Sequence, residues 1–433
     1  MRITAPQSAA ASAPSAGAGA GAEADSSGAA TAADEQRPAT PAEDPIATDR
    51  IEREIAAAFA ARRAQAESYG APFARLWIHA SECVAGGKLL RPRLLLGAFD
   101  ALTGHAPEPA DPGDAGEQAS PGNRTTDAET LKRPAPRRSR EAALRVAAGV
   151  ELLHYSFLLH DDVIDGDLLR RGRPNVIGAI LHDGDPAAPG GEGPCRSADE
   201  RRLHWARTNG ILLGDLLLSA AYQVFAREDL PHDTRLRLLD LVDRTITESV
   251  AGEQADVGLS DGFIAPELST VLEMSRLKTA SYTFELPLRA AALLAGAAPA
   301  AENAVGEAGR HLGIAFQLQD DLLSTFGCEA EHGKDAFSDL REGKETAIIA
   351  YARMTSIWPA LEAGYGNPSL SIAEARAMRD SLAECGAEGF MRSLVQEQTQ
   401  AAIDLLATQR AAIPDALARY LIELAGSLEG RRA

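Results

Sequence analysis

Cysteine is scarce in this chain and is never paired in sequence. Only four of the 433 residues are cysteine, and none stands in a C-x-x-C pair. Such wide spacing is unlike a disulfide framework or a zinc site, so we expect free thiols in a reducing compartment. The four residues are Cys83, Cys195, Cys328 and Cys385.

Basic residues are too few to give the chain a positive field. Lys and Arg number 43 against 62 Asp and Glu, which gives a formal net charge of -19. A general nucleic-acid surface needs a basic field, so we expect no nucleic-acid partner. A polyanionic substrate would have to be held by local Lys and Arg side chains or by metal ions.

Long apolar runs are missing as well. No uninterrupted apolar stretch reaches the ~18 residues that a membrane span requires. The N-terminus has no apolar core of the kind found in signal peptides. These absences predict a cytoplasmic protein with no stable membrane insertion.

The sequence shows no period-2 alternation between hairpin turns, and no internal repeat. Apolar residues recur instead at helical spacing, and the hydrophobic content of 45% is enough for a large core. We therefore predict an all-α fold, a single large bundle of about ten or more helices. Helical segments are expected at 51–73, 93–102, 140–165, 198–228, 232–259, 266–295 and 300–326, with further helices after them.

Two kinds of segment interrupt the helical pattern. Residues 1–45 are rich in Ala, Gly, Ser and Pro, and they bury too little apolar surface to offset the entropy of ordering. We predict a disordered tail there, followed by one domain over 46–433. Pro- and Gly-rich stretches at 104–139 and 183–197 are predicted to be flexible insertions in that domain.

The stretch HDDVIDGDLLRRGRP at 160–174 carries the clearest chemistry. It ends an apolar helix, and Asp161 and Asp165 are four residues apart and therefore share a helix face. The C-terminal end of a helix already carries partial negative charge, so these acids together with Asp162 require a compensating cation. Mg²⁺ is the natural candidate because it takes oxygen ligands and bridges carboxylates to phosphates.

A second acidic helix end lies far away in sequence, in FQLQDDLLSTF at 316–326. If Asp320 and Asp321 face the first acidic end across a bundle, the two ends form a mouth that can hold several Mg²⁺ ions and a diphosphate. Lys and Arg side chains, which suit phosphate groups, occur in the motifs around both ends. These cations are Lys88, Arg91, Arg170, Arg171, Lys278, Lys334 and Lys344.

Several motifs occur together and in order. They are GGKLLRP (86–92), HDDVIDGDLLRRGRP (160–174), GDLLL (214–218), KT (278–279), FQLQDDLL (316–323) and GKDAFSDLREGKET (333–346). In this combination the chain resembles the trans-type polyprenyl (isoprenyl) diphosphate synthases. The resemblance implies an isoprenoid-synthase bundle around a central apolar cavity. It also implies a homodimeric prenyltransferase that uses about three Mg²⁺ per site and takes isopentenyl diphosphate and an allylic diphosphate as substrates.

The resemblance also assigns roles position by position. The implied metal ligands are Asp161, Asp162, Asp165, Asp320 and Asp321. The positions that hold the diphosphate of isopentenyl diphosphate are Lys88, Arg91, His154 and Arg171. Those around the allylic diphosphate are Arg170, Lys278, Thr279, Gln317 and Lys334. Catalysis, by drawing charge from the leaving diphosphate, falls to Asp161, Asp165, Asp320 and Lys278. Glu253 and Asp256 stand where the family often has a Gln and an Asp near the metals.

Two further positions bear on the product and on activity. In this family, bulky side chains four or five positions before the first Asp close the product channel, and here Ser156 is small whereas Phe157 is large. This favours geranylgeranyl diphosphate (C20), with a farnesyl or a longer-chain product as the alternatives. Ser324 stands where the family usually has the third Asp of the second motif, and we expect activity to survive this change.

Three other functions compete with this interpretation. A class I terpene cyclase uses one Asp-rich motif and a different second metal motif, so the second Asp-Asp helix and the GGK segment count against it. A non-catalytic regulatory subunit of a partner prenyl synthase would have lost metal or phosphate residues, whereas only position 324 is altered here. A long-chain quinone-tail synthase would differ only in the depth of its channel.

Overall fold

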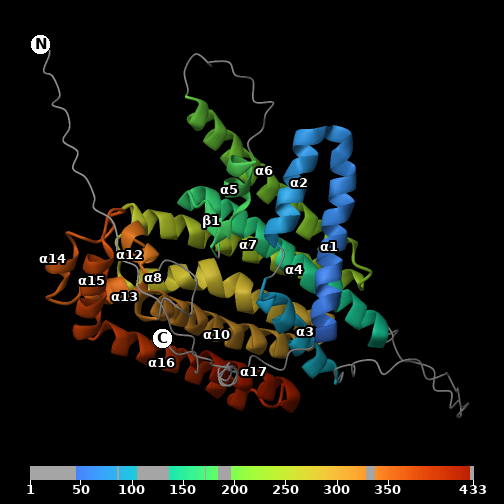
Figure 1. The fold of residues 1–433 in the computed structure, drawn as a ribbon. Coiled ribbons are helices and arrows are strands. Elements are labelled where there is room, and N and C mark those ends of the chain that lie inside the picture. Colours follow the sequence, from blue (N-terminus) through green and yellow to red (C-terminus); the bar gives the residue numbers. More distant parts are fainter. Residues whose placement is uncertain are drawn as a thin grey trace, which may run out of the picture. The chain divides into compact units, whose positions relative to one another are not determined.

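The computed structural model describes residues 45–84, 87–104, 136–170, 172–183, 197–327 and 337–429. All of them belong to one compact unit, Ala39–Ala433, while a second unit, Met1–Pro38, lies outside the described residues. Regular structure in the described residues is helical except for one antiparallel hairpin, β1 (Leu169–Arg170) and β2 (Arg173–Pro174). The predicted all-α fold is confirmed (Figure 1).

The helices of the described residues follow one another in a simple order. They are α1 (Pro45–Ala66), η1 (Glu67–Tyr69), α2 (Ala71–Val84), α3 (Leu90–Thr103), α4 (Pro136–Asp165), α5 (Val176–His182), α6 (Ala198–Arg227), α7 (His232–Ser260), α8 (Leu268–Ser275), η2 (Arg276–Glu285), α9 (Leu286–Leu294), α10 (Pro299–Phe326), α12 (Ser338–Glu342), α13 (Ala347–Arg353), α14 (Trp358–Leu361), α15 (Ile372–Glu384), α16 (Ala387–Thr408) and α17 (Asp415–Glu429).

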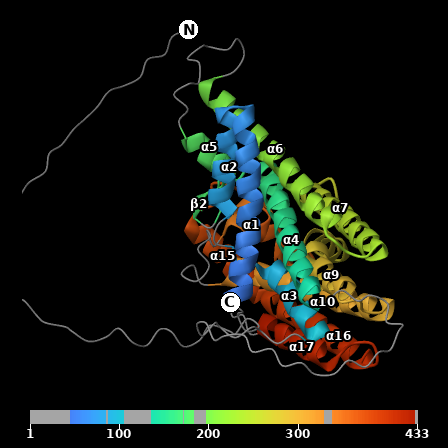
Figure 2. The same cartoon turned by 90° about the vertical axis from the view of Figure 1, so that its right-hand side faces the viewer.

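Helix α4 is the most deeply buried of the long helices near the predicted site. Apolar residues occupy most positions of its middle turns, and Val146, Val150 and Leu153 are each at most 1% exposed. A wide apolar surface on a helix has to be buried, and α4 packs against α1, α3 and α6 (Figure 2). These neighbours fix the C-terminal end of α4, where the first acidic motif lies.

Among the residues that the structure describes, two helices are long and apolar enough to cross a membrane by length and composition, although neither contains an uninterrupted apolar run of ~18 residues. They are Arg140–Asp165 and Ala198–Arg227. In the first, 83% of the apolar window is buried inside the protein, which is what a core helix requires; in the second the share is 44%. Since core helices pass the same test, this is weak evidence for a membrane span.

The structure differs from the sequence expectation at three boundaries. The helix expected over 51–73 is divided, because Gly70 adopts a positive φ of 107° and ends the first segment before α2 begins. Helix α4 begins at Pro136, inside the insertion predicted to end at residue 139. Most of that insertion, most of the one at 183–197 and nearly all of the predicted tail lie outside the described residues.

The third difference is the segment expected to be one helix over 266–295. It consists of α8, the π-helix η2 and α9. Two neighbouring helices approach η2 closely at glycines. A Cβ on Gly252 of α7 would lie 2.2 Å from the backbone nitrogen of Lys278, and a Cβ on Gly313 of α10 would lie 2.5 Å from the Ala280 Cβ. The wide turn of η2 is thus packed tightly between α7 and α10. This packing fixes the positions of Lys278 and Thr279.

Candidate active site

Lys278 of η2 lies at the centre of three acids that come from two other helices, α4 and α7. Its Nζ is 3.2 Å from Asp161 Oδ1, 2.9 Å from Glu253 Oε2 and 2.5 Å from Asp256 Oδ2. Burial by itself would lower the pKa of Lys278, but the three carboxylates outweigh it and raise the pKa. Lys278 therefore stays charged, and it joins α4, α7 and η2 at one point.

The first acidic motif is neutralised by an arginine that the chain folds back onto it. Helix α4 ends at Asp165, Gly166 takes a positive φ of 75°, and the β1–β2 hairpin returns Arg170 to the helix end. Arg170 Nη2 donates to Asp162 Oδ1 at 2.6 Å and to Asp161 Oδ2 at 3.3 Å. Asp162 is only 3% exposed, and its burial raises the pKa to about 6 although Arg170 opposes the shift.

Asp161 and Asp165 differ in their electrostatic surroundings. For Asp161, burial would raise the pKa, but the charges of Lys278 and Arg170 prevail and hold the pKa below its usual value. For Asp165, burial prevails and raises the pKa, although Lys344 Nζ lies 3.1 Å from its Oδ2. Lys344, predicted as a phosphate cation, thus reaches the first acidic motif from the segment that follows α12.

The second acidic motif is reached through a chain of hydrogen bonds. Thr279 Oγ1 donates to Gln317 Oε1 at 2.8 Å, and Gln317 Nε2 donates to Asp321 Oδ1 at 2.8 Å. Asp321 is buried, and burial raises its pKa to about 8. Asp320 is exposed, and Ser324 is half-buried. Because Lys278 and Thr279 are adjacent on η2, they connect the two acidic helix ends, whose first acids, Asp161 and Asp320, are 159 residues apart in the sequence.

Two of the four residues predicted to hold isopentenyl diphosphate, Arg91 and His154, contact Tyr282 of η2. The Arg91 guanidinium lies 4.5 Å from the centre of the Tyr282 ring, and its Nη2 donates to Thr283 Oγ1 at 2.8 Å. The His154 ring stacks on the Tyr282 ring, with centroids 5.8 Å apart. Lys88 is exposed, whereas Arg171 and the allylic-site residue Lys334 lie outside the described residues.

The two chain-length residues point to different neighbours. The Phe157 ring meets the Tyr282 ring edge-on, with centroids 5.1 Å apart. Ser156 is fully buried, and its Oγ donates to the Gly214 carbonyl of α6 at 2.8 Å. Phe157 therefore faces η2 and the predicted substrate residues, whereas Ser156 faces α6. Tyr282 had no part in the sequence prediction; its position four residues after Lys278 was the available signal.

The donor set of the cluster fits Mg²⁺ in kind, since carboxylate oxygens are the ligands that this ion prefers. One buried oxygen, Glu253 Oε1, has no hydrogen-bond partner among the described residues. Within the described ranges no three acids, histidines or cysteines converge closely enough to hold a metal ion. The oxygens of these carboxylates pair instead with Lys278, Arg170 and Lys344.

Comparison with known proteins agrees with this geometry. A family model described as polyprenyl synthetase matches residues 78–357. A geranylgeranyl diphosphate synthase of Methanosarcina mazei is 30% identical over 253 residues, which cover 58% of this chain and 69% of the relative. One from Sulfolobus acidocaldarius is 30% identical over 295 residues, covering 66% and 80%.

The chain belongs to the polyprenyl synthetase family. A solved geranylgeranyl pyrophosphate synthase from Corynebacterium glutamicum, complexed with isoprenyl diphosphate and magnesium, superposes with a TM-score of 0.73 at 28% identity. The superposition covers 90% of this chain and 100% of that one. This polyprenyl synthetase is thus a prenyltransferase with the isoprenoid-synthase bundle, as the motifs predicted.

Proposed function

We propose that this polyprenyl synthetase condenses isopentenyl diphosphate with an allylic diphosphate to make geranylgeranyl diphosphate (C20), as a Mg²⁺-dependent cytoplasmic homodimer. The observation that carries the proposal is the junction on η2. Lys278 contacts the first acidic motif and Thr279 reaches the second through Gln317. A diphosphate held at this junction would touch both acidic motifs and their cations at once.

The roles proposed for Mg²⁺ and for the basic side chains follow from where those side chains lie. When bound, Mg²⁺ supplies a Lewis acid that polarises the diphosphate oxygens, and Asp161, Asp165 and Asp320 would be among its ligands. Lys278 and Arg170 would donate hydrogen bonds to the same diphosphate. These bonds strengthen as negative charge develops on the leaving oxygen, so they favour breaking of the allylic C–O bond.

The second substrate would be held on the far side of Tyr282. Arg91 and His154 both contact this ring, so a diphosphate bound there would lie beside the aromatic wall. The double bond of isopentenyl diphosphate attacks the allylic carbon and forms the new C–C bond. The resulting isopentenyl unit then loses a proton, which passes to the released pyrophosphate. Phe157 and Tyr282 would keep water away from the carbocation.

The C20 length rests on Phe157 and on the relatives. Phe157 lies one helical turn, ~5.4 Å of rise, before Asp161, and its edge-on contact with Tyr282 would close the channel beneath the allylic site. The relatives named above are geranylgeranyl diphosphate synthases. A farnesyl or a longer product remains the alternative outcome.

The test is a product assay. The purified chain is incubated with Mg²⁺, isopentenyl diphosphate and, in separate reactions, C5, C10 and C15 allylic diphosphates, and product lengths are read by mass spectrometry. A C20 product from every primer supports the whole proposal. A product of C30 or more retains the prenyltransferase and rejects the C20 assignment, whereas no elongation from any primer favours a non-catalytic subunit.

A further inference from the structure

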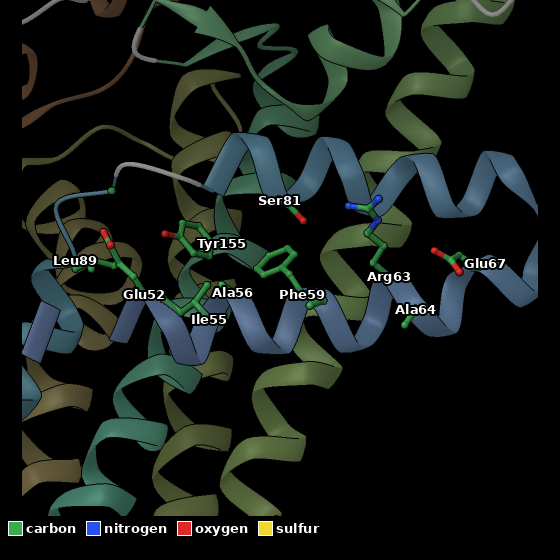
Figure 3. Close-up of a pocket in the computed structure, with 12 residues that line it drawn as sticks. Glu52, Ile55, Ala56, Phe59, Arg63, Ala64, Glu67, Ser81, Leu89 and Tyr155 are labelled. Atoms are coloured by element: carbon green, nitrogen blue, oxygen red, sulfur yellow. The ribbon is translucent and has the colours of Figure 1, made fainter. Parts of the chain in front are cut away.

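A cavity of about 600 Å³ opens between α1 and α2, on a part of the molecule to which the proposed reaction assigns no role (Figure 3). Its floor is made by Ile55, Phe59, Leu89 and Tyr155, each at most 9% exposed. Ligand sites typically have volumes of ~300–1,000 Å³ and mostly apolar linings. The cavity therefore has the size and the floor of a site for a small apolar molecule.

The polar part of the lining limits the charge of the occupant. Arg63 extends from α1 toward α2, and Glu67, the first residue of η1, lines the cavity one turn further along the chain (Figure 3). Glu52 lines it near Leu89. With two glutamates against one arginine the lining is net negative, which disfavours a diphosphate or a carboxylate. Arg63 and the Ser81 hydroxyl can still bond to a neutral oxygen.

The cavity is connected to the residues proposed to hold isopentenyl diphosphate. Gly87 and Leu89 line it and flank Lys88 in the chain. Tyr155 lines it and stacks on His154, with ring centroids 5.8 Å apart. His154 in turn stacks on Tyr282, which lies beneath Arg91. A contiguous set of packed side chains thus runs from the cavity to the substrate residues.

An element with two conformations is needed for such a connection to carry a signal. Leu89 is in the left-handed region, with φ 47°, and it is the sole non-glycine among the described residues with a positive φ. This conformation costs free energy for a leucine, so the loop of Gly87, Lys88 and Leu89 is where a second arrangement would be least costly. A molecule packed on Leu89 would favour the arrangement described here, in which Arg91 Nη2 donates to Thr283 and not to a diphosphate.

We propose that the α1–α2 cavity binds an uncharged amphiphile with a long apolar chain and a hydroxyl head group, of the prenyl alcohol type, and that its binding weakens the binding of isopentenyl diphosphate. The second half of this proposal rests on the proposed function. The first half does not, because binding can be measured without catalysis.

Binding is measured through tryptophan fluorescence with geranylgeraniol as the probe. Trp77 is buried behind Phe59, their rings 5.9 Å apart, so it should report on the cavity. Ala60 lines the cavity, whereas the exposed Ala61 next to it does not. We expect saturable binding to the wild type and to Ala61→Phe, and binding weakened about tenfold or more by Ala60→Phe, which fills the site. Ala64→Leu, at another lining alanine, replaces Ala60→Phe if that variant does not fold.

The coupling is measured in the product assay. Geranylgeraniol should raise the KM for isopentenyl diphosphate about fivefold with kcat unchanged in the wild type and in Ala61→Phe, and should leave Ala60→Phe unaffected. Hexadecanoate serves as the anionic comparison and should not bind. Absence of saturable binding, equal binding by Ala60→Phe, or equal binding of hexadecanoate would overturn the proposal. Failure to make product without any alcohol would reject the proposed function and leave the binding result standing.

Discussion

Lys278 is the residue on which the acidic cluster depends most. It faces three carboxylates at 3.2 Å or less, so its replacement removes the cation proposed to stabilise the leaving diphosphate and leaves three acids together. We expect Lys278→Met to lower kcat about a hundredfold or more. Without Mg²⁺ it should also lose about 1–3 kcal/mol of unfolding free energy, less than a fully buried pair because Lys278 is partly exposed.

The measurements are kcat at saturating substrates and urea unfolding without metal. Arg392→Met is the matched control, since it removes a cation from an exposed pair with Glu388 on α16. That control should retain wild-type kcat and stability within about 0.5 kcal/mol. If Lys278→Met keeps most of its activity, the leaving-group role of Lys278 is wrong.

Phe157 offers a second test on a single side chain. Its ring meets Tyr282 edge-on, and truncation to alanine would open space beneath the proposed allylic site. We expect Phe157→Ala to shift the product distribution to chains longer than C20, as read by mass spectrometry. Phe73→Ala, an aromatic truncation on α2, should leave the distribution as it is. An unchanged distribution in Phe157→Ala would show that the channel is closed elsewhere.

Among the elements, η2 depends on two glycines that belong to its neighbours. A Cβ on Gly252 would lie 2.2 Å from the backbone nitrogen of Lys278, which is much closer than Cβ atoms approach other atoms in proteins. Gly252→Ala must therefore displace η2 or α7, and we expect a loss of about 1–3 kcal/mol in unfolding free energy together with a reduced kcat. Both are measured by urea unfolding and by the product assay.

A helical glycine in open space provides the control for that variant. Gly389 on α16 has nothing within 4 Å of where its Cβ would lie. Gly389→Ala should stabilise the protein by about 0.5–1 kcal/mol, because alanine loses less backbone entropy in a helix. Equal effects of the two substitutions would mean that the close approach of α7 to η2 does not determine the position of Lys278.

For the helices, the sequence predicted where three of the long ones begin and end, but it did not predict the π-helix. Helices α6, α7 and α10 lie within two residues of the segments expected from periodicity, because that signal is local. The π-helix η2 could not be predicted, since it arises where glycines from α7 and α10 let two other helices approach. Gly252 and Gly313, placed inside helical patterns, were the only sequence signal of that approach.

The same distinction holds for the candidate site. The shared face of Asp161 and Asp165 follows from their spacing on one helix. The contacts of Lys278 with Glu253 and Asp256, and of Arg91 with Tyr282, join elements far apart in the chain. The positions of these pairs follow from tertiary packing, which no local pattern encodes.

For the molecule as a whole, the acidic cluster is partly neutralised without a metal ion. Lys278, Arg170 and Lys344 pair with its carboxylates, so the fold should not need Mg²⁺ even though the proposed reaction does. We expect EDTA to abolish product formation and to change Tm by no more than about 2 °C, with activity restored on addition of Mg²⁺. A large fall in Tm would assign the metal a structural role, and activity in EDTA would reject the metal-dependent reaction.

The proposed homodimer rests on an apolar face of α6. Trp205 and Leu212 are seven residues apart, on one face of the helix, and are 54% and 51% exposed; Ile211 beside them is 45% exposed. Large apolar side chains gathered in this way mark an interaction surface, and a two-fold axis would bring the same face of a second copy onto it. A charge placed there would be desolvated in a dimer interface, which is costly.

Trp205→Glu should therefore convert the dimer into a monomer, as measured by size-exclusion chromatography with light scattering at micromolar concentration. Met354→Glu is the control, because Met354 is equally apolar and 63% exposed but lies outside α6. It should leave the mass of the wild type unchanged, and circular dichroism should show that both variants are folded. A wild-type monomer would reject the homodimer. A dimer that survives Trp205→Glu would move the interface away from α6, and the exposed apolar face would then require another partner.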